Sequence, residues 1–93
     1  MSDEQVLFAA AVLGKDAEEF LSSDLGRVLL GNAEQEAAEA LEELASADAT
    51  DSKLMMRLQA KVWRARSFSG WLSELVINGQ QALSVLDSRD RDD

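Results

Sequence analysis

Proline is absent from all 93 residues, and this absence constrains the fold more than any other feature of the sequence. Proline in a helix interior costs about 3 kcal/mol, so a chain without it can form long uninterrupted helices. Alanine, leucine, glutamate and glutamine are abundant and favour helix. No segment shows the alternation of β-branched residues that is typical of strands. The sequence therefore predicts an all-α fold.

Start and stop signals divide the N-terminal region into one or two short helices. Ser2 and Gln5 fit a capping box, so the first helix should begin at Asp3. Gly14 is typical of a helix end, and Asp16 of the cap of a short second segment. We expect these short helices to pack on the helices that follow them.

The polar stretch 46–52 predicts a loop between two long helices, of about residues 24–47 and 51–87. A loop this short makes its two helices antiparallel neighbours, so they should form a long helical hairpin. Each is expected to be one helix, with a break or kink at Gly31 and a distortion at Gly79 as the alternatives. We predict a single helical domain over residues 1–87 and a disordered acidic tail over residues 88–93.

Apolar residues recur at helical spacing along each expected helix, and they predict which side of each helix faces inward. The middle of the 24–47 stripe is alanine, which indicates close approach of a neighbouring helix. The expected inward residues are Val6, Leu7, Ala10 and Leu13 in the first helix, Leu25, Val28, Leu29, Ala33, Ala37, Ala40, Leu41 and Leu44 in the next, and Leu54, Leu58, Val62, Ala65, Leu72, Val76, Leu83 and Leu86 in the last.

Histidine and cysteine are both missing, and this excludes most catalytic and metal chemistry. Zinc sites of the usual Cys/His kind, disulfides, Cys nucleophiles and Ser-His-Asp triads all need one of these residues. Carboxylate pairs such as Glu39 and Glu43 occur without the histidines of a di-iron motif, so a solvated helix face is the favoured interpretation. We expect no enzyme activity, no cofactor and no metal.

The net charge of -9 is unevenly distributed along the chain. Residues 1–50 contain twelve acidic and two basic side chains, whereas residues 51–79 contain two acidic and five basic ones. Folding the hairpin would bring Glu36 near Lys61 and Glu39 near Arg57. Charge pairing across the hairpin is therefore the favoured interpretation of this pattern.

Basic and aromatic residues also follow one stripe of the last helix, and this stripe together with Trp63 is the candidate interface. An exposed aromatic patch would mark a partner or oligomer surface, whereas packing of the first helix over Trp63 would place that residue in the core. A further alternative is binding of nucleotide or nucleic acid, although the acidic remainder opposes it. The candidate interface residues are Arg57, Lys61, Trp63, Arg64, Phe68 and Trp71.

An acidic face on the helix before the loop suggests another alternative. Such a face can imitate the phosphates of DNA, so the protein would inhibit a nucleic-acid-handling or defence system of a host. The residues of this acidic face are Glu34, Glu36, Glu39 and Glu43.

Small size favours self-association, because a chain of this length buries only roughly 60–65% of its unfolded surface. The apolar run 6–13 is too short to cross a bilayer, and the residues before it are acidic, unlike those of a signal peptide. We therefore expect no membrane partner.

Three short segments carry a resemblance to a known class: Phe20-Leu21 before Leu25-Gly26, the run 33–36 (AEQE), and Ser67-Phe68 with Trp71-Leu72. With them, residues 19–86 resemble small acidic all-helical proteins of tailed bacteriophages and prophages, encoded near packaging and head genes. The resemblance implies a noncatalytic accessory or morphogenesis protein and assigns no residue a role.

That resemblance also sets the expected partners and location. We expect a homo-oligomer or binding to another phage or host protein, rather than to nucleic acid. The expected location is the cytoplasm of an infected or lysogenic bacterium, with association with the virion as an alternative.

Overall fold

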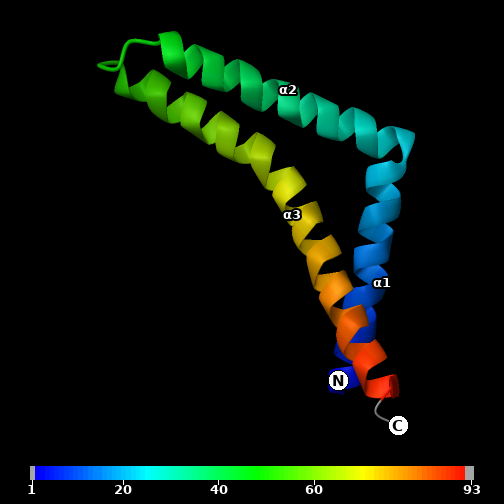
Figure 1. Ribbon diagram of the computed structural model, residues 1–93. Helices are drawn as coiled ribbons and strands as arrows, with labels where there is room; N and C mark the ends of the chain where they lie inside the picture. The colour runs from blue at the N-terminus through cyan, green and yellow to red at the C-terminus, as the bar shows by residue number, and fades with distance from the viewer. Residues whose placement is uncertain (1, 92–93) are drawn as a thin grey trace. The chain divides into compact units, whose positions relative to one another are not determined.

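A computed structural model of the chain describes residues 2–91, which form three α-helices and no strand (Figure 1). The helices are α1 (Asp3–Ser22), α2 (Asp24–Ser46) and α3 (Ser52–Arg91). The predicted all-α class is confirmed, with α2 and α3 forming the hairpin and α1 as one N-terminal helix.

Contacts group the helices into two compact units. The terminal unit comprises Met1–Ser23 and Trp71–Asp93, and the hairpin unit comprises Asp24–Gly70. Helix α3 therefore contributes its first half to the hairpin unit and its second half to the terminal unit. The single domain expected over residues 1–87 stays a prediction.

The beginning of α1 is stabilised by the predicted capping box. The Gln5 backbone N–H donates to the Ser2 hydroxyl at 3.2 Å, and the Ser2 backbone N–H donates to Gln5 Oε1 at 3.0 Å. These bonds satisfy two N–H groups that a helix start otherwise leaves without partners. The predicted end at Gly14 is wrong, because α1 continues to Ser22.

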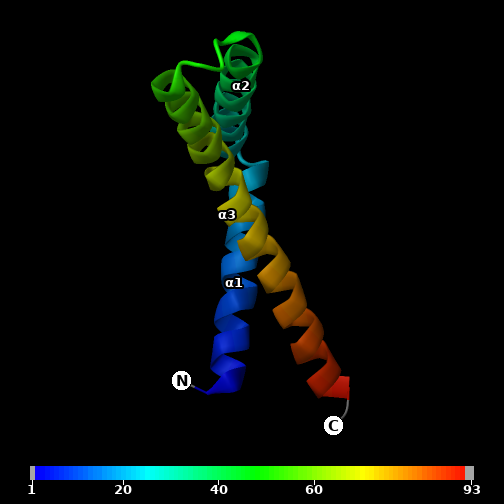
Figure 2. The same ribbon diagram turned by 90° about the vertical axis from the view of Figure 1, so that its left-hand side faces the viewer.

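Gly14 lies inside α1 because its backbone lies against that of Gly79 in the second half of α3, within the terminal unit. Figure 2 shows α1 and α3 crossing at an angle. A Cβ atom added to Gly14 would lie 2.7 Å from the Gly79 Cα and 2.8 Å from the Leu75 carbonyl oxygen. Both glycines therefore allow a backbone contact that any side chain would prevent. The buried neighbours Ala11, Ala17 and Ala82 are small as well.

Two further contacts join α1 to the second half of α3. Asp3 pairs with Arg89 at 2.7 Å, and Gln80 donates to Glu18 Oε1 at 3.3 Å. Together with the Gly14–Gly79 contact, the Asp3–Arg89 pair shows that the two segments run antiparallel. The predicted inward stripe of α1 is only partly correct, since Val6 and Leu13 are exposed and the buried face lies around Gly14 instead.

The hairpin unit also packs through small residues. Ala37 and Ala40 are buried in α2, and Leu58 and Ala65 are buried in the first half of α3, as the apolar stripes predict. Helix α2 is continuous through the exposed Gly31, which agrees with the single helix expected over residues 24–47.

The start of α2 departs from its predicted stripe. Leu25 and Val28 are exposed, whereas Gly26 between them is buried. The inward side of α2 is therefore lined by smaller residues at this end than the apolar pattern suggests.

Between α2 and α3, residues 47–51 form the predicted loop. The Thr50 backbone N–H and hydroxyl both donate to Asp48 Oδ1, at 2.9 and 2.7 Å. The hydrogen bond from the Thr50 backbone N–H is the main cause that holds the pKa of the Asp48 carboxyl below its ordinary value, and the bond from the Thr50 hydroxyl is the second. Asp51 is the cap of α3, because its Oδ1 accepts from the Leu54 N–H at 3.1 Å.

At its other end α3 is longer than expected. It passes the predicted end at residue 87 and continues through Ser88 to Arg91. The Arg89 pair with Asp3 lies in this extension. Residues 92–93 of the predicted tail lie outside the described residues.

Candidate protein-interaction surfaces

The buried residues of the described chain are almost all small. Leu58 is the one large apolar side chain among them, and the other buried hydrophobic residues within 2–91 are alanines. Each unit contains only two packed helical segments. Two helices cannot surround a large side chain, so most of the large apolar residues keep one side in solvent. The candidate sites are therefore surfaces rather than cavities.

In the hairpin unit, the main apolar surface lies beside Trp63. The Trp63 side chain is 70% exposed and borders an open groove of about 520 Å³ between α2 and α3. Met56 is 69% exposed and precedes Trp63 by seven residues, which places it about two turns away on the same side of α3. The groove is lined by Leu41, Leu44, Gln59, Val62, Trp63, Arg66 and Ser67.

The two interpretations of Trp63 can now be compared. Within the described residues nothing covers most of its surface, so the structure favours an exposed patch over a core position. An exposed tryptophan at the edge of an apolar groove is typical of binding surfaces, where tryptophan is enriched.

The candidate interface residues do not all line one hollow. Arg64 forms an ion pair with Glu36 across the hairpin, at 3.0 Å. Phe68 is half-buried and, with Arg64 and Glu36, lines a smaller hollow of about 280 Å³ that is separate from the Trp63 groove. Trp63 and Arg66 line the other groove, so the structure places the candidate residues on two different sides of α3.

Charge pairing across the hairpin occurs with a different partner from the one predicted. Glu36 pairs with Arg64 rather than with Lys61, which lies one turn earlier in α3. Glu39 accepts a hydrogen bond from Gln35 within α2, at 3.2 Å, where a pair with Arg57 was expected. The pairing of Glu36 supports the antiparallel arrangement but leaves the side chains largely in solvent, so its contribution is small.

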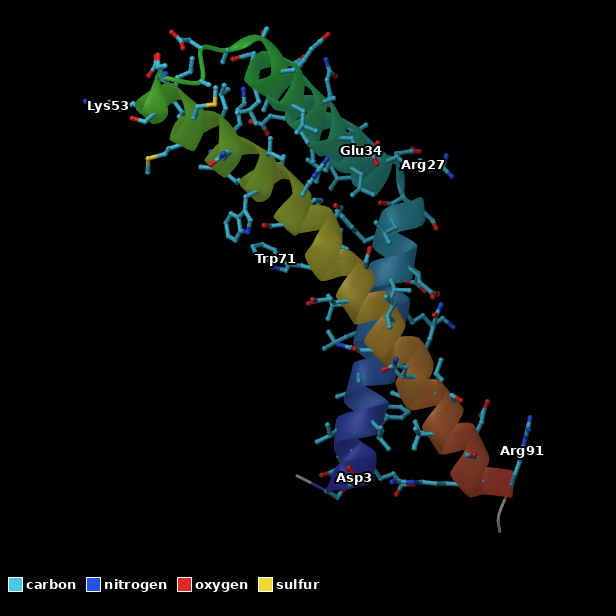
Figure 3. All side chains as sticks on the ribbon, turned by 60° about the vertical axis from the view of Figure 1, so that its left-hand side comes forward. Asp3, Arg27, Glu34, Lys53, Trp71 and Arg91 are labelled. Atoms are coloured by element: carbon cyan, nitrogen blue, oxygen red, sulfur yellow. The ribbon has the colours of Figure 1, made fainter. Side chains whose placement is uncertain are left out.

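The remaining candidate interface residues differ in exposure. Arg57 is exposed, and Lys61 is half-buried beside α2. Trp71 belongs to the terminal unit, where its side chain is 62% exposed and projects from α3 (Figure 3). Residues 52–70 carry five basic and no acidic side chains, so the Trp63 groove lies on the most basic segment of the chain.

The acidic face of α2 is a solvated helix surface. Glu34, Glu39 and Glu43 are exposed, while Glu36 is half-buried and engaged by Arg64. This engagement reduces the charge that the face could present as an imitation of DNA phosphates. Within residues 2–91, no cluster of three acidic side chains is arranged to hold a metal ion.

A second apolar groove, of about 740 Å³, lies in the terminal unit and was not predicted from the sequence. Phe8, which is 65% exposed, lines this groove, called here the Phe8 groove. The run of eight successive apolar residues from Val6 to Leu13 could have indicated this groove, because it covers every side of α1. The groove is lined by Glu4, Gln5, Phe8, Ala9, Ala11, Val12, Lys15, Leu83, Leu86, Asp87 and Asp90.

Comparisons with known proteins add no relative. No protein family, curated protein or solved structure matches the chain. None of the helices in the described part of the chain combines the length and the hydropathy needed to cross a membrane.

Proposed function

We propose that this protein is a noncatalytic interaction protein that binds another protein through the Trp63 groove of its hairpin unit. The observation that carries this proposal is the position of Trp63, which is 70% exposed at the edge of an apolar groove. Exposing a tryptophan to water is unfavourable, and burying its ring area on binding would recover roughly 2–3 kcal/mol.

The chemistry around the groove indicates what kind of partner it fits. Leu41, Leu44 and Val62 supply an apolar floor, and Arg66 lies at its edge. All five charged side chains of residues 52–70 are basic. The complementary surface is therefore a protein that inserts an apolar side chain and surrounds it with carboxylates, because such a partner meets both the groove and its charge.

The resemblance to small acidic helical phage proteins supplies the biological class. We propose a phage accessory or morphogenesis protein, which acts in the infected or lysogenic cell by assembling with another phage or host protein. A chain without histidine or cysteine supports a binding role rather than a catalytic one, because few catalytic side chains remain.

The test is affinity purification of the tagged protein from infected cells, followed by mass spectrometry. Trp63→Ala should remove a specific partner that the unchanged protein retains. Leu25→Ala is the matched control, since Leu25 is 62% exposed in the same unit and does not line the groove. The proposal fails if Trp63→Ala retains the partner, or if the Leu25→Ala control loses it equally.

A further inference from the structure

We propose that the Phe8 groove of the terminal unit binds the same groove of a second copy, related by a two-fold axis. This inference goes beyond the proposed function, because it assigns self-association to a surface other than the Trp63 groove. The product is an antiparallel four-helix bundle made from α1 and the second half of α3 of each copy.

Helix α1 is incompletely buried within the terminal unit. Residues 6–13 are apolar on every side of the helix, and helices of this kind are normally surrounded by other elements. Within the terminal unit, the second half of α3 is the single neighbour of α1. Phe8, Val12 and Leu83 are 65%, 45% and 49% exposed on one side of this pair. A second copy would cover this side.

The charges around the groove complement those of a second copy that is rotated about the two-fold axis. Glu4 and Lys15 both line the groove, with Phe8 and Val12 between them on α1. They are separated by eleven residues, or about three turns and roughly 16 Å. When the two-fold axis passes between residues 9 and 10 of two antiparallel α1 helices, Glu4 of one copy lies opposite Lys15 of the other.

The acidic residues contributed by α3 strengthen this arrangement. Asp3 pairs with Arg89, and Gly14 contacts Gly79, so Asp87 and Asp90 lie toward the Glu4 end of the groove. One end of the groove is therefore acidic and the other carries Lys15. Within residues 2–91 neither Glu4 nor Lys15 forms an ion pair, which leaves both available to a second copy.

The area of the open face of the terminal unit also fits a dimer. A face two helices wide and 20 residues long measures about 30 Å by about 20 Å, or roughly 600 Å² on each copy. Both copies together bury about 1,200 Å², the lower limit of stable specific interfaces. Because an isologous contact uses the same groove twice, one Phe8 groove per chain suffices for the whole interface.

The first experiment measures the dimer dissociation constant by sedimentation equilibrium. Phe8→Glu should raise this constant at least about 30-fold, as expected for a buried aromatic anchor. Trp63→Glu is the matched control, because Trp63 is similarly exposed but lies in the hairpin unit. It should leave the constant unchanged. Circular dichroism checks that both variants keep their helices.

The second experiment tests the two-fold pairing of charges. Lys15→Glu and Glu4→Lys should each weaken self-association about tenfold, because each replaces two attractions per dimer by repulsions. An equimolar mixture of the two variants should form a heterodimer. The Lys15→Glu variant has a carboxylate at positions 4 and 15, and the Glu4→Lys variant has an ammonium group at both. Both pairs between position 4 of one copy and position 15 of the other are then attractive. High salt should reduce this preference.

The outcomes separate this inference from the proposed function. A dimer that survives Phe8→Glu, or variants that form no heterodimer on mixing, would overturn the two-fold groove contact. So would loss of the dimer with Trp63→Glu alone, which would move self-association to the other groove. The Phe8→Glu and charge-variant results do not bear on the partner captured through Trp63, which the purification experiment tests separately.

Discussion

Replacing Gly14 by alanine should separate α1 from α3 and destabilise the terminal unit. The added Cβ would lie 2.7 Å from the Gly79 Cα and 2.8 Å from the Leu75 carbonyl oxygen. Carbon atoms in contact normally lie about 3.5–4.0 Å apart, so the helices must move by about 1 Å. Both obstructing atoms belong to backbone and cannot rotate away.

The magnitude follows from two opposing effects. Overpacking of this kind costs about 1–3 kcal/mol, and the rigid backbone on the far side places this site near the upper value. Alanine gains about 1 kcal/mol over glycine in helix propensity. We therefore expect Gly14→Ala to lower the free energy of unfolding by about 2 kcal/mol. Gly31→Ala provides the control, because a Cβ there meets no atom within 4 Å. It should stabilise by about 0.5–1 kcal/mol.

The assay is thermal unfolding followed by circular dichroism, at one fixed protein concentration because self-association would shift the midpoint. A change of 1 kcal/mol in the free energy of unfolding shifts the unfolding midpoint by about 4–8 °C for a chain of this size. Gly14→Ala should unfold at a lower temperature than the unchanged protein, and Gly31→Ala at a higher one. The reasoning is refuted if Gly14→Ala is as stable as the Gly31→Ala control.

Three further predictions concern helix ends and charges. Ser2→Ala should cost about 1 kcal/mol in thermal unfolding, because it removes the capping box of α1. Folding lowers the pKa of the Asp48 carboxyl, so this group stabilises the fold above its unfolded pKa, and the stabilisation is lost as pH falls through its folded pKa. In urea unfolding, the free energy of unfolding of Asp48→Ala should therefore differ from that of the unchanged protein at pH 7 and converge with it in acid. Glu36→Lys and Arg64→Glu should each destabilise by less than about 1 kcal/mol, and the double variant should recover stability in low salt but not in high salt.

Features that depend on neighbouring residues were predictable from the sequence. The capping box of Ser2 and Gln5 forms as expected, since both partners lie within one turn of helix. The alanine stripe of α2 correctly indicated close packing, because Ala37 and Ala40 are buried against the first half of α3. The loop residues likewise identified the start of α3 closely.

Features set by contacts between distant segments were not predictable in this way. Gly14 and Gly79 are typical helix ends when judged locally, yet they lie within helices because they meet each other across α1 and α3. Their spacing from Ala17 and Ala82, three residues on in each case, was the available signal of a close crossing.

The candidate site shows the same difference between local and distant effects. Helical spacing placed Arg64, Phe68 and Trp63 on one segment, but packing of α2 engages the first two and leaves Trp63 exposed. The Phe8 groove was missed because the apolar run of α1 indicates burial without indicating which sides a single neighbour leaves open.

The central claim is that the apolar surfaces left open by a core of small residues are covered by other protein molecules. The most direct test is the mass of the unchanged protein in solution, measured by sedimentation velocity over a wide range of concentrations. The proposed two-fold contact predicts a species of twice the chain mass that becomes dominant as concentration rises. A chain that remains strictly monomeric at the highest concentrations would contradict it.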